Sequence, residues 1–224
     1  ALLYFGKRLS EQTTETMLTQ LATRQEVKCA VVEEAPISLS PLLGEGFTGA
    51  PGLELVNDSI AWSVGPELQE VRQPSSATVE FVSVDKLRGI EVVHSITLDK
   101  NTDVLSAHTV LTNLGDLPLS VNFCAAPTFQ LPDSVSKIVS FEGRWSNEFQ
   151  RQSVDLVLGS FVRENRKGKT SHDVFPGLLV HNESAGEQHG ECYGFHLGWS
   201  GNNKLRAELL AEGRRYVQMG ELLL

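Results

Sequence analysis

The strongest constraint on the fold is a succession of short strand-like segments that starts at Leu53 and continues to the end of the chain. Their apolar residues alternate or form brief runs, and they lack the three- and four-residue spacing of a helix face. Gly, Pro, Asn and Asp separate them at intervals typical of an antiparallel sandwich. The clearest segments are residues 53–56, 60–64, 78–82, 90–98, 105–112, 119–123, 156–158, 178–180, 204–212 and 214–219.

This pattern predicts an all-β fold, a large antiparallel β-sandwich of more than a dozen strands with at most one or two short helices. One helix is expected within residues 10–24, where Met17, Leu18 and Leu21 share a face behind a possible N-cap at Ser10. Further strands are expected at 1–5 and 27–32, and a Gly/Pro-rich loop at 36–51. The chain has no βαβ alternation, phosphate-binding glycine loop or heptad pattern.

Composition limits the classes of partner. The 224 residues are 41% hydrophobic, enough for one large domain with a real core. The formal net charge of −9 argues against nucleic-acid or anionic-membrane partners, because phosphate groups would be repelled. No apolar run approaches the roughly 18 to 20 residues that span a bilayer. A neutral ligand therefore fits the composition better than a charged polymer.

The cysteines and histidines show no metal-ligand spacing. Cys29, Cys124 and Cys192 are scattered, so we expect buried free thiols in a reducing, cytoplasmic environment. The six histidines lack the spacing of zinc proteases or zinc fingers, and His94 and His108 are expected as structural residues within strands. We accordingly expect no metal site and no cofactor.

Three clusters of unusual residues lie between strand-like runs, at 141–149, 168–176 and 190–202. Because they occupy turns, we expect them to gather at sheet ends, where Gly, Ser, Asn, Trp and His suit a polar, ring-shaped ligand such as a sugar. The tryptophans Trp62, Trp145 and Trp199 are candidates for sugar stacking, although packing in the core is the more common use of such residues.

Catalytic groups are harder to find. Glycoside hydrolysis requires two cooperating carboxylates, and the candidates are Glu33 with Glu34 and Glu142 with Glu148. Surface solvation is the favoured interpretation of all four. The consecutive letters Ser171-His172-Asp173 contain the residues of a hydrolytic triad, but neighbouring residues seldom align their side chains and no nucleophile elbow is present. The sequence assigns no catalytic residue.

Taken together, several motifs resemble the amino-terminal domain of family 36 α-galactosidases over nearly all 224 residues. In chain order they are Tyr4-Phe5-Gly6-Lys7-Arg8-Leu9, Asn113, Gly143-Arg144-Trp145 with Glu148 and Arg151, Gly159, Gly168-Lys169-Thr170-Ser171-His172 with Pro176, Gly190-Glu191-Cys192-Tyr193-Gly194-Phe195, and Ser200-Gly201-Asn202. The resemblance implies a β-supersandwich placed ahead of a (β/α)8 barrel.

The resemblance also implies what this chain lacks. Family members hydrolyse terminal α-linked galactose with retention, using two aspartates on barrel strands that would lie beyond Leu224. Residues 1–224 are therefore expected to be a single non-catalytic domain without the family's first strands and without the downstream barrel. The implied partners are that barrel, an α-galactoside substrate in the full enzyme and further copies of the chain in a homo-oligomer.

One family loop approaches the galactose pocket, and it matches residues 39–53 here. Its usual arginine is absent, which leaves Glu45, Phe47 and Thr48 as candidate substrate contacts. The resemblance gives Trp145, His172 and Trp199 structural or interface roles. The alternative is a freestanding carbohydrate-binding or structural β-sandwich, and an esterase that uses Ser171 and His172 is a more remote third.

Overall fold

The computed structural model describes residues 2–6, 8–22, 37–57 and 60–222. Within them the chain forms one α-helix, α1 (Glu15–Ala22), one 3-10 turn, η1 (Leu43–Glu45), and antiparallel strands. The all-β prediction is confirmed. The strands are β1 (Leu53–Asn57), β2 (Ile60–Trp62), β3 (Glu67–Ser75), β4 (Thr78–Asp85), β5 (Ile90–Leu98), β6 (Leu105–Asn113), β7 (Ser120–Leu131), β8 (Val135–Arg144), β9 (Asn147–Asp155), β10 (Gly159–Asn165), β11 (Gly177–Asn182), β12 (Cys192–His196), β13 (Asn203–Leu209) and β14 (Arg215–Leu222).

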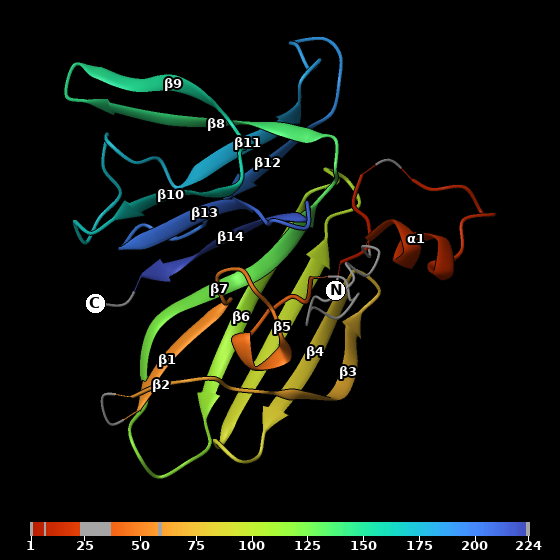
Figure 1. Ribbon diagram of the computed structural model, residues 1–224, viewed down its shortest axis with the longest axis vertical. Coiled ribbons are helices and arrows are strands. Elements are labelled where there is room, and N and C mark those ends of the chain that lie inside the picture. Colours follow the sequence, from red (N-terminus) through yellow and green to blue (C-terminus); the bar gives the residue numbers. More distant parts are fainter. Residues whose placement is uncertain (1, 7, 23–36, 58–59, 223–224) are drawn as a thin grey trace.

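The strands form three sheets. A six-stranded sheet has the order β10-β13-β14-β7-β1-β2, and two four-stranded sheets have the orders β12-β11-β8-β9 and β3-β4-β5-β6. In Figure 1 the six-stranded sheet crosses the middle of the molecule, with β8, β9, β11 and β12 above it and β3 to β6 below it. Strand β7 joins the two halves, since it pairs with β14 along one part of its length and with β1 along the other.

Period-two alternation on β13 and β14 builds the upper core. Leu205 and Ala207 of β13 share a face with Val217 and Met219 of β14, and this face packs against apolar residues of β8 and β11, among them Ile138. Side chains that alternate across a pleated strand give each strand two chemically different faces. The opposite face of β13 and β14 is polar.

A second core lies in the lower half, between β1, β5 and the nearby loops. Leu53 and Leu55 of β1 pack with Ile90 and Val92 of β5, together with Leu42 from the loop before β1. A hydrogen bond from Thr109 Oγ1 on β6 to the carbonyl oxygen of residue 125 on β7, at 2.7 Å, also ties the lower sheet to β7. Apolar burial on this scale is the main stabilising contribution to a domain of this size.

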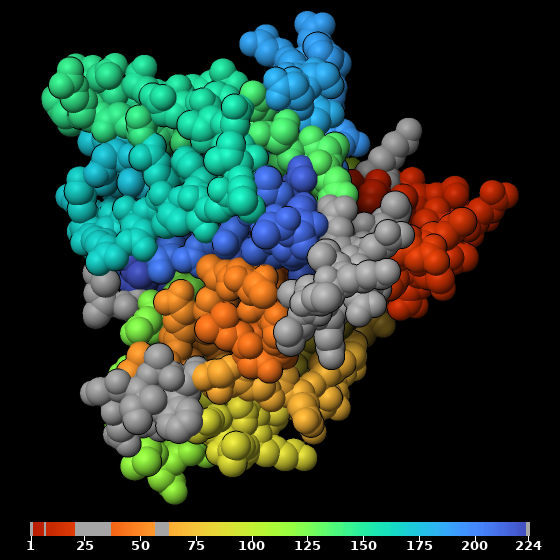
Figure 2. All heavy atoms as spheres, in the orientation of Figure 1, coloured from red at the N-terminus to blue at the C-terminus, as the bar shows by residue number. Residues whose placement is uncertain are grey.

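Residues 37–52 contain the described part of the Gly/Pro-rich loop predicted at 36–51, and they lie against β7. The Ile37 amide donates to Gln130 Oε1 at 3.0 Å, the Thr128 amide donates to the Leu39 carbonyl at 2.8 Å, and a further bond joins the Gly52 carbonyl to β7 at 2.7 Å. In Figure 2 these orange residues fill the front of the molecule between the blue strands above and the yellow strands below. The loop is thus an anchored part of the fold.

Several sequence predictions were wrong in detail. Residues 2–5 form no strand, and residues 67–75, where no strand is predicted, form β3, which contains Pro74 and is exposed along its whole length at the edge of its sheet. An edge strand tolerates proline because one row of its backbone groups has no partner, and the pairing with β4 is irregular between Arg72 and Ser75. The run 156–158 forms no strand, and only Leu158 makes an isolated bridge. The strand expected at 27–32 lies outside the described residues.

The expectation of buried thiols was only partly right. Cys124 is half-buried and Cys192 is exposed, and both are free, while Cys29 lies outside the described residues. Among the helices of the described ranges, none combines the length and apolar character needed to cross a membrane.

Candidate functional site

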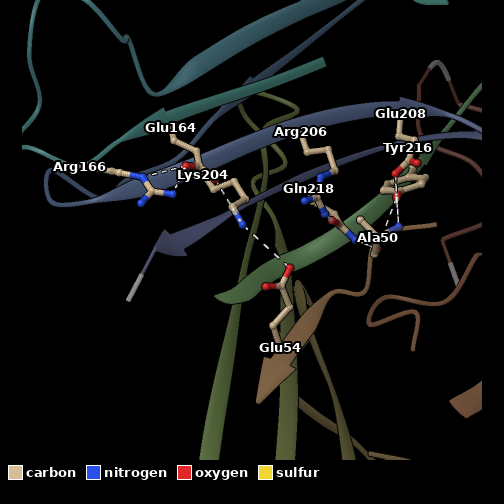
Figure 3. A network of polar contacts seen from close by, with 9 residues as sticks. All are labelled: Ala50, Glu54, Glu164, Arg166, Lys204, Arg206, Glu208, Tyr216 and Gln218. Carbon is tan, nitrogen blue, oxygen red and sulfur yellow. Dashed lines mark hydrogen bonds and ion pairs between the residues drawn. The ribbon is translucent and has the colours of Figure 1, made fainter. Parts of the chain in front are cut away.

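The polar face of β13 and β14 holds the loop 37–52 in place (Figure 3). Tyr216 is fully buried, and its hydroxyl donates to the Glu208 carboxylate and accepts the Ala50 amide proton at 2.8 Å. Burial and the neighbouring Glu208 carboxylate raise the pKa of Tyr216, so the phenol stays protonated and remains a donor. This cluster fixes the end of the loop.

Gln218 lies two residues after Tyr216, on the same face of β14, and completes the attachment of the loop. Its Nε2 donates to the Ala50 carbonyl at 2.9 Å and to Thr128 Oγ1 at 3.1 Å, while Arg206 Nη1 donates to its Oε1 at 3.3 Å. Gln218 is fully buried, so each of these bonds is made away from water. The loop backbone at Ala50 is therefore held through both its amide and its carbonyl.

Lys204 lies at the other end of the same face (Figure 3). Its ammonium is 3.5 Å from Glu164 and 4.0 Å from Glu54, and it sits 5.0 Å from the centre of the Phe123 ring. Burial alone would raise the pKa of Glu164, but hydrogen bonding to Arg166 and the charge of Lys204 outweigh it and lower the pKa. Because every charge here is paired, the cluster is structural and offers no free acid or base.

The three predicted substrate contacts occupy the loop 37–52. Glu45 ends the turn η1 and is exposed, and Thr48 is also exposed. Partial burial of the carboxyl group raises the pKa of Glu45, and a hydrogen bond from the Leu42 backbone opposes this shift. Phe47 instead turns inward, with its ring edge-on to Tyr216 at 5.6 Å. Glu45 and Thr48 face solvent, whereas Phe47 is a packing residue of the loop.

A second candidate site forms where β8 turns into β9. The rings of Phe141 and Phe149 stack at 4.6 Å, and Phe175 meets Phe149 edge-on at 5.0 Å. Trp145, at the tip of the hairpin, lies edge-on to His172 with ring centres 6.1 Å apart. Trp145 is 82% exposed, so it does not pack into the core of this domain, contrary to the more common use of tryptophan.

The rings of Phe141, Phe149 and Phe175 line an open hollow of about 400 Å³, and Trp145 lies beside it through its contact with His172. Besides the aromatic residues, its lining contains the single carboxylate Glu148 and the consecutive polar residues Lys169, Thr170, Ser171 and His172. A hydrogen bond from the Ser146 amide holds the pKa of Glu148 below its usual value, so this carboxyl is ionised near neutral pH. The hollow therefore combines aromatic surface with hydroxyl, imidazole, ammonium and carboxylate groups.

The first two predicted clusters and the end of the third meet at this end of the molecule. The Gly168 amide donates to Asn202 Oδ1 at 2.7 Å, and the Thr170 hydroxyl donates to the Ser200 carbonyl at 3.3 Å. Trp199, from the same third cluster, is 45% exposed, and its indole lies so close to Gly201 that a side chain there would overlap it. The prediction that the clusters gather is confirmed for these residues, whereas Gly190 lies against Asn182 and Ala185, at the opposite end of β12.

The catalytic candidates are not brought together. Glu142 pairs with Arg163, whereas Glu148 lines the hollow. In the sequence Ser171-His172-Asp173, Asp173 binds Lys167 at 2.6 Å, and this bond with one from Ser171 lowers its pKa to about 2, so no Ser-His-Asp relay forms. Glu33 and Glu34 lie outside the described residues. Within the described ranges no three His, Cys, Asp or Glu side chains cluster closely enough to hold a metal ion.

Sequence reasoning missed two groups of residues. Tyr216, Glu208 and Gln218 drew no attention because a polar residue that alternates with apolar ones in a strand normally faces water. Phe149 was read only as part of a turn cluster, and its positive φ of 57° is visible only in the backbone. No pattern in the sequence indicates that these residues lie beside Ala50 or Phe141.

The whole chain, residues 1–224, matches the family model described as the glycosyl hydrolase family 36 N-terminal domain. An α-galactosidase from Escherichia coli is 34% identical over 185 residues, which are 83% of this chain and 26% of that protein. The α-galactosidase AgaA of Geobacillus stearothermophilus is 28% identical over 148 residues, 66% of this chain and 20% of that protein. The chain thus spans about a quarter or less of the length of these curated relatives.

Solved structures share the fold. The crystal structure of AgaA from Geobacillus stearothermophilus superposes with a TM-score of 0.74 at 24% identity, over 81% of this chain and 28% of that one. An α-galactosidase from Lactobacillus brevis superposes with a TM-score of 0.77 at 18% identity, over 98% of this chain and 33% of that one. In both cases the similarity covers only a part of a longer chain.

Proposed function

Because the chain belongs to the glycosyl hydrolase family 36 N-terminal domain family, we propose that it is the non-catalytic amino-terminal domain of an α-galactosidase. In the complete enzyme the reaction is hydrolysis of terminal α-linked galactose with retention of configuration. The E. coli relative is named an α-galactosidase, and this chain corresponds to 26% of it. The remaining part of such an enzyme is the partner that we propose, a catalytic barrel that follows this domain.

The observation that carries this proposal is the carboxylate content of the open hollow. A retaining glycosidase needs two carboxyl groups about 5–5.5 Å apart on either side of the scissile bond. The lining of the hollow contains only one, Glu148, and the nearby Glu142 pairs with Arg163. An acid and a nucleophile are therefore not assembled there, which supports a role outside the chemical step.

We further propose that the loop 37–52 shapes the entrance to the active site, with Glu45 and Thr48 toward substrate. The support is its geometry, since hydrogen bonds to β7 and β14 hold both ends of the loop while the turn η1 projects exposed residues between them. A preorganised loop loses little conformational entropy when it meets a ligand. Phe47 acts within this proposal by packing on Tyr216 and setting the direction of the loop.

Assembly is the third role that we propose for the domain. Trp145 and Trp199 are large exposed aromatic residues, and buried aromatic anchors dominate the energetics of protein interfaces. Together with His172, they are our candidates for contact with the barrel or with another copy of the chain.

The free thiols of Cys124 and Cys192 support a reducing, cytoplasmic location.

The proposal is tested by comparing this 224-residue chain with a longer protein that continues in the same reading frame beyond Leu224. We expect hydrolysis of a chromogenic α-galactoside by the longer protein and none by the 224 residues alone. Activity in the short chain would contradict the proposal, and Glu148→Gln and Glu142→Gln would then locate the acid. A reading frame that closes at Leu224 would favour the alternative, a freestanding carbohydrate-binding or structural module, which the exposed aromatic hollow independently favours.

A further inference from the structure

We infer that the hollow at the β8–β9 hairpin is a carbohydrate-binding site that takes a neutral hexopyranose ring of an oligosaccharide. This site lies on other elements than the loop 37–52 and performs no chemistry. The site uses Trp145 and His172, which are also our candidates for an interface, so a partner that covers them would exclude the sugar. The inference is therefore made for the 224-residue chain, whose described residues supply every group that it uses.

Aromatic rings form the apolar part of the site. Phe149 lines the hollow and is 57% exposed, and Trp145 lies beside the hollow against His172 and is 82% exposed, although both residue types normally lose most of their surface in a folded domain. Phe149 is fixed from below by its stack on Phe141 and from the side by Phe175. A pyranose ring presents a face of C–H groups that packs on such a surface, since the face of an aromatic ring carries partial negative charge.

Polar groups form the other part. Thr170 and Ser171 offer hydroxyl oxygens as acceptors, since their protons bind the Ser200 carbonyl and Asp173. His172 offers an imidazole, and Lys169 and Glu148 offer one charge of each sign. Hydroxyl groups of a sugar both donate and accept hydrogen bonds, so they can use all five. The paired presence of a cation and an anion disfavours a strongly charged ligand and leaves a neutral polyhydroxylated ring as the best match.

The backbone around the hollow is held in unusual conformations. Ser146 and Phe149 have positive φ angles of 64° and 57°, values that residues other than glycine adopt rarely and at a cost. On the opposite wall, Asn165 Nδ2 binds the Lys169 carbonyl at 2.7 Å, and Asn202 binds the Gly168 amide at 2.7 Å. Strain on one wall and side-chain ties on the other preorganise the site, as ligand sites often require.

The test is a titration of the 15N-labelled 224-residue chain with melibiose, an α-galactosyl disaccharide, followed by amide and indole chemical shifts. We expect saturable shifts at the Trp145 indole and at the amides of residues 169–172, with a Kd on the order of millimolar, as is usual for so small a ligand. Sorbitol, which has hydroxyls but no ring, is the matched probe and should produce no saturable shifts. Shifts confined to the loop 37–52, or none at all, would overturn the inference.

Three variants identify the stacking surface. Trp145→Ala should weaken melibiose binding roughly tenfold, whereas Trp145→Phe should keep most of the affinity because an aromatic face remains. Trp199→Ala is the matched control and should bind as the wild type does, because Trp199 is also exposed but, unlike Trp145, makes no ring contact with a lining residue of the hollow within the described part of the chain. Equal affinity of Trp145→Ala and the wild type would refute the site even if the sugar binds elsewhere. Shifts produced instead by inorganic phosphate, with none from melibiose, would replace the neutral ligand with an anion and also refute it.

Discussion

Removal of the Tyr216 hydroxyl tests whether the polar cluster holds the loop 37–52. Tyr216→Phe keeps the buried ring and its contact with Phe47 but removes the donor to Glu208 and the acceptor of the Ala50 amide. No cavity of side-chain size forms, so the loss of hydrogen bonds dominates the effect. A bond to a charged group contributes about 1.5–3 kcal/mol, and the Ala50 amide keeps only its longer bond to Glu208 Oε2 at 3.3 Å.

We therefore expect Tyr216→Phe to lower the free energy of unfolding by about 2–3 kcal/mol, measured by urea denaturation near neutral pH. For a domain of this size the Tm should fall by about 4–12 °C. The matched control is Tyr193→Phe, whose half-buried ring packs edge-on to Phe5 at 4.7 Å and whose hydroxyl makes no hydrogen bond within the described part of the chain. The control should change stability by less than about 0.5 kcal/mol.

Hydrogen exchange tells local from global effects. If the cluster clamps the loop, the Ala50 amide should exchange faster in Tyr216→Phe than expected from the loss of global stability alone, since its protection depends on local opening. Equal stabilities of Tyr216→Phe and wild type would refute the clamp. A loss in Tyr193→Phe as large as that in Tyr216→Phe would show that any buried phenol matters and that the cluster has no special role.

Three other substitutions test the close packing at Gly220, the titration of His94 and the solvent exposure of Trp145. A Cβ at Gly220 would overlap a β7 carbonyl oxygen, so Gly220→Ala should lose about 3 kcal/mol or more, whereas Gly65→Ala, with nothing within 4 Å, should unfold like the wild type in urea. Burial lowers the pKa of His94 to about 4 in the folded state. Below pH 6.5 the unfolded chain therefore binds a proton at this histidine that the folded chain does not bind, and stability decreases as the pH is lowered from about 6.5 to 4. Between pH 7.5 and 5.5 the free energy of unfolding should fall by about 1.4 kcal/mol more in the wild type than in His94→Gln. The control His108→Gln, at an exposed histidine, should behave like the wild type. If the wild type and His94→Gln show the same dependence of stability on pH, His94 is excluded as the cause. Trp145→Ala should change the free energy of unfolding by less than about 0.5 kcal/mol, and a loss of 3 kcal/mol would mean that the indole is buried in solution.

Alternation and turn residues were sufficient to predict the class of the fold and most of its strands. The segment 90–98, for example, becomes β5 without change because its apolar residues face one core and its neighbours face the other side. Register and strand partners were out of reach, since they depend on pairing between distant segments. The edge strand β3 was missed for a related reason, because an exposed edge imposes no apolar pattern on its residues.

The candidate sites divide in the same way. The clustering of His172, Trp145 and Asn202 near one end of the molecule followed from their positions in turns. The burial of Gln218 could not be predicted, because its partner Ala50 lies 168 residues away and a lone glutamine in a strand normally faces solvent. The exposure of Trp145 contradicts its hydrophobicity, and only the hairpin geometry around it explains why the ring projects outward.

The polar cluster of Tyr216, Glu208 and Gln218 fixes the position of the loop 37–52 in a way that a larger apolar core could not. Apolar contacts are not directional, so a loop that packed only through Phe47 could slide along β14 by a fraction of a residue. The bonds from Tyr216 and Gln218 to the two backbone groups of Ala50 permit one position along the strand. Gly49 reinforces this choice, because a Cβ there would meet the ring of Phe47 and the hydroxyl of Tyr216 at less than 3 Å. A fixed register is what a loop needs if its exposed turn, with Glu45, is to meet a ligand in one defined geometry.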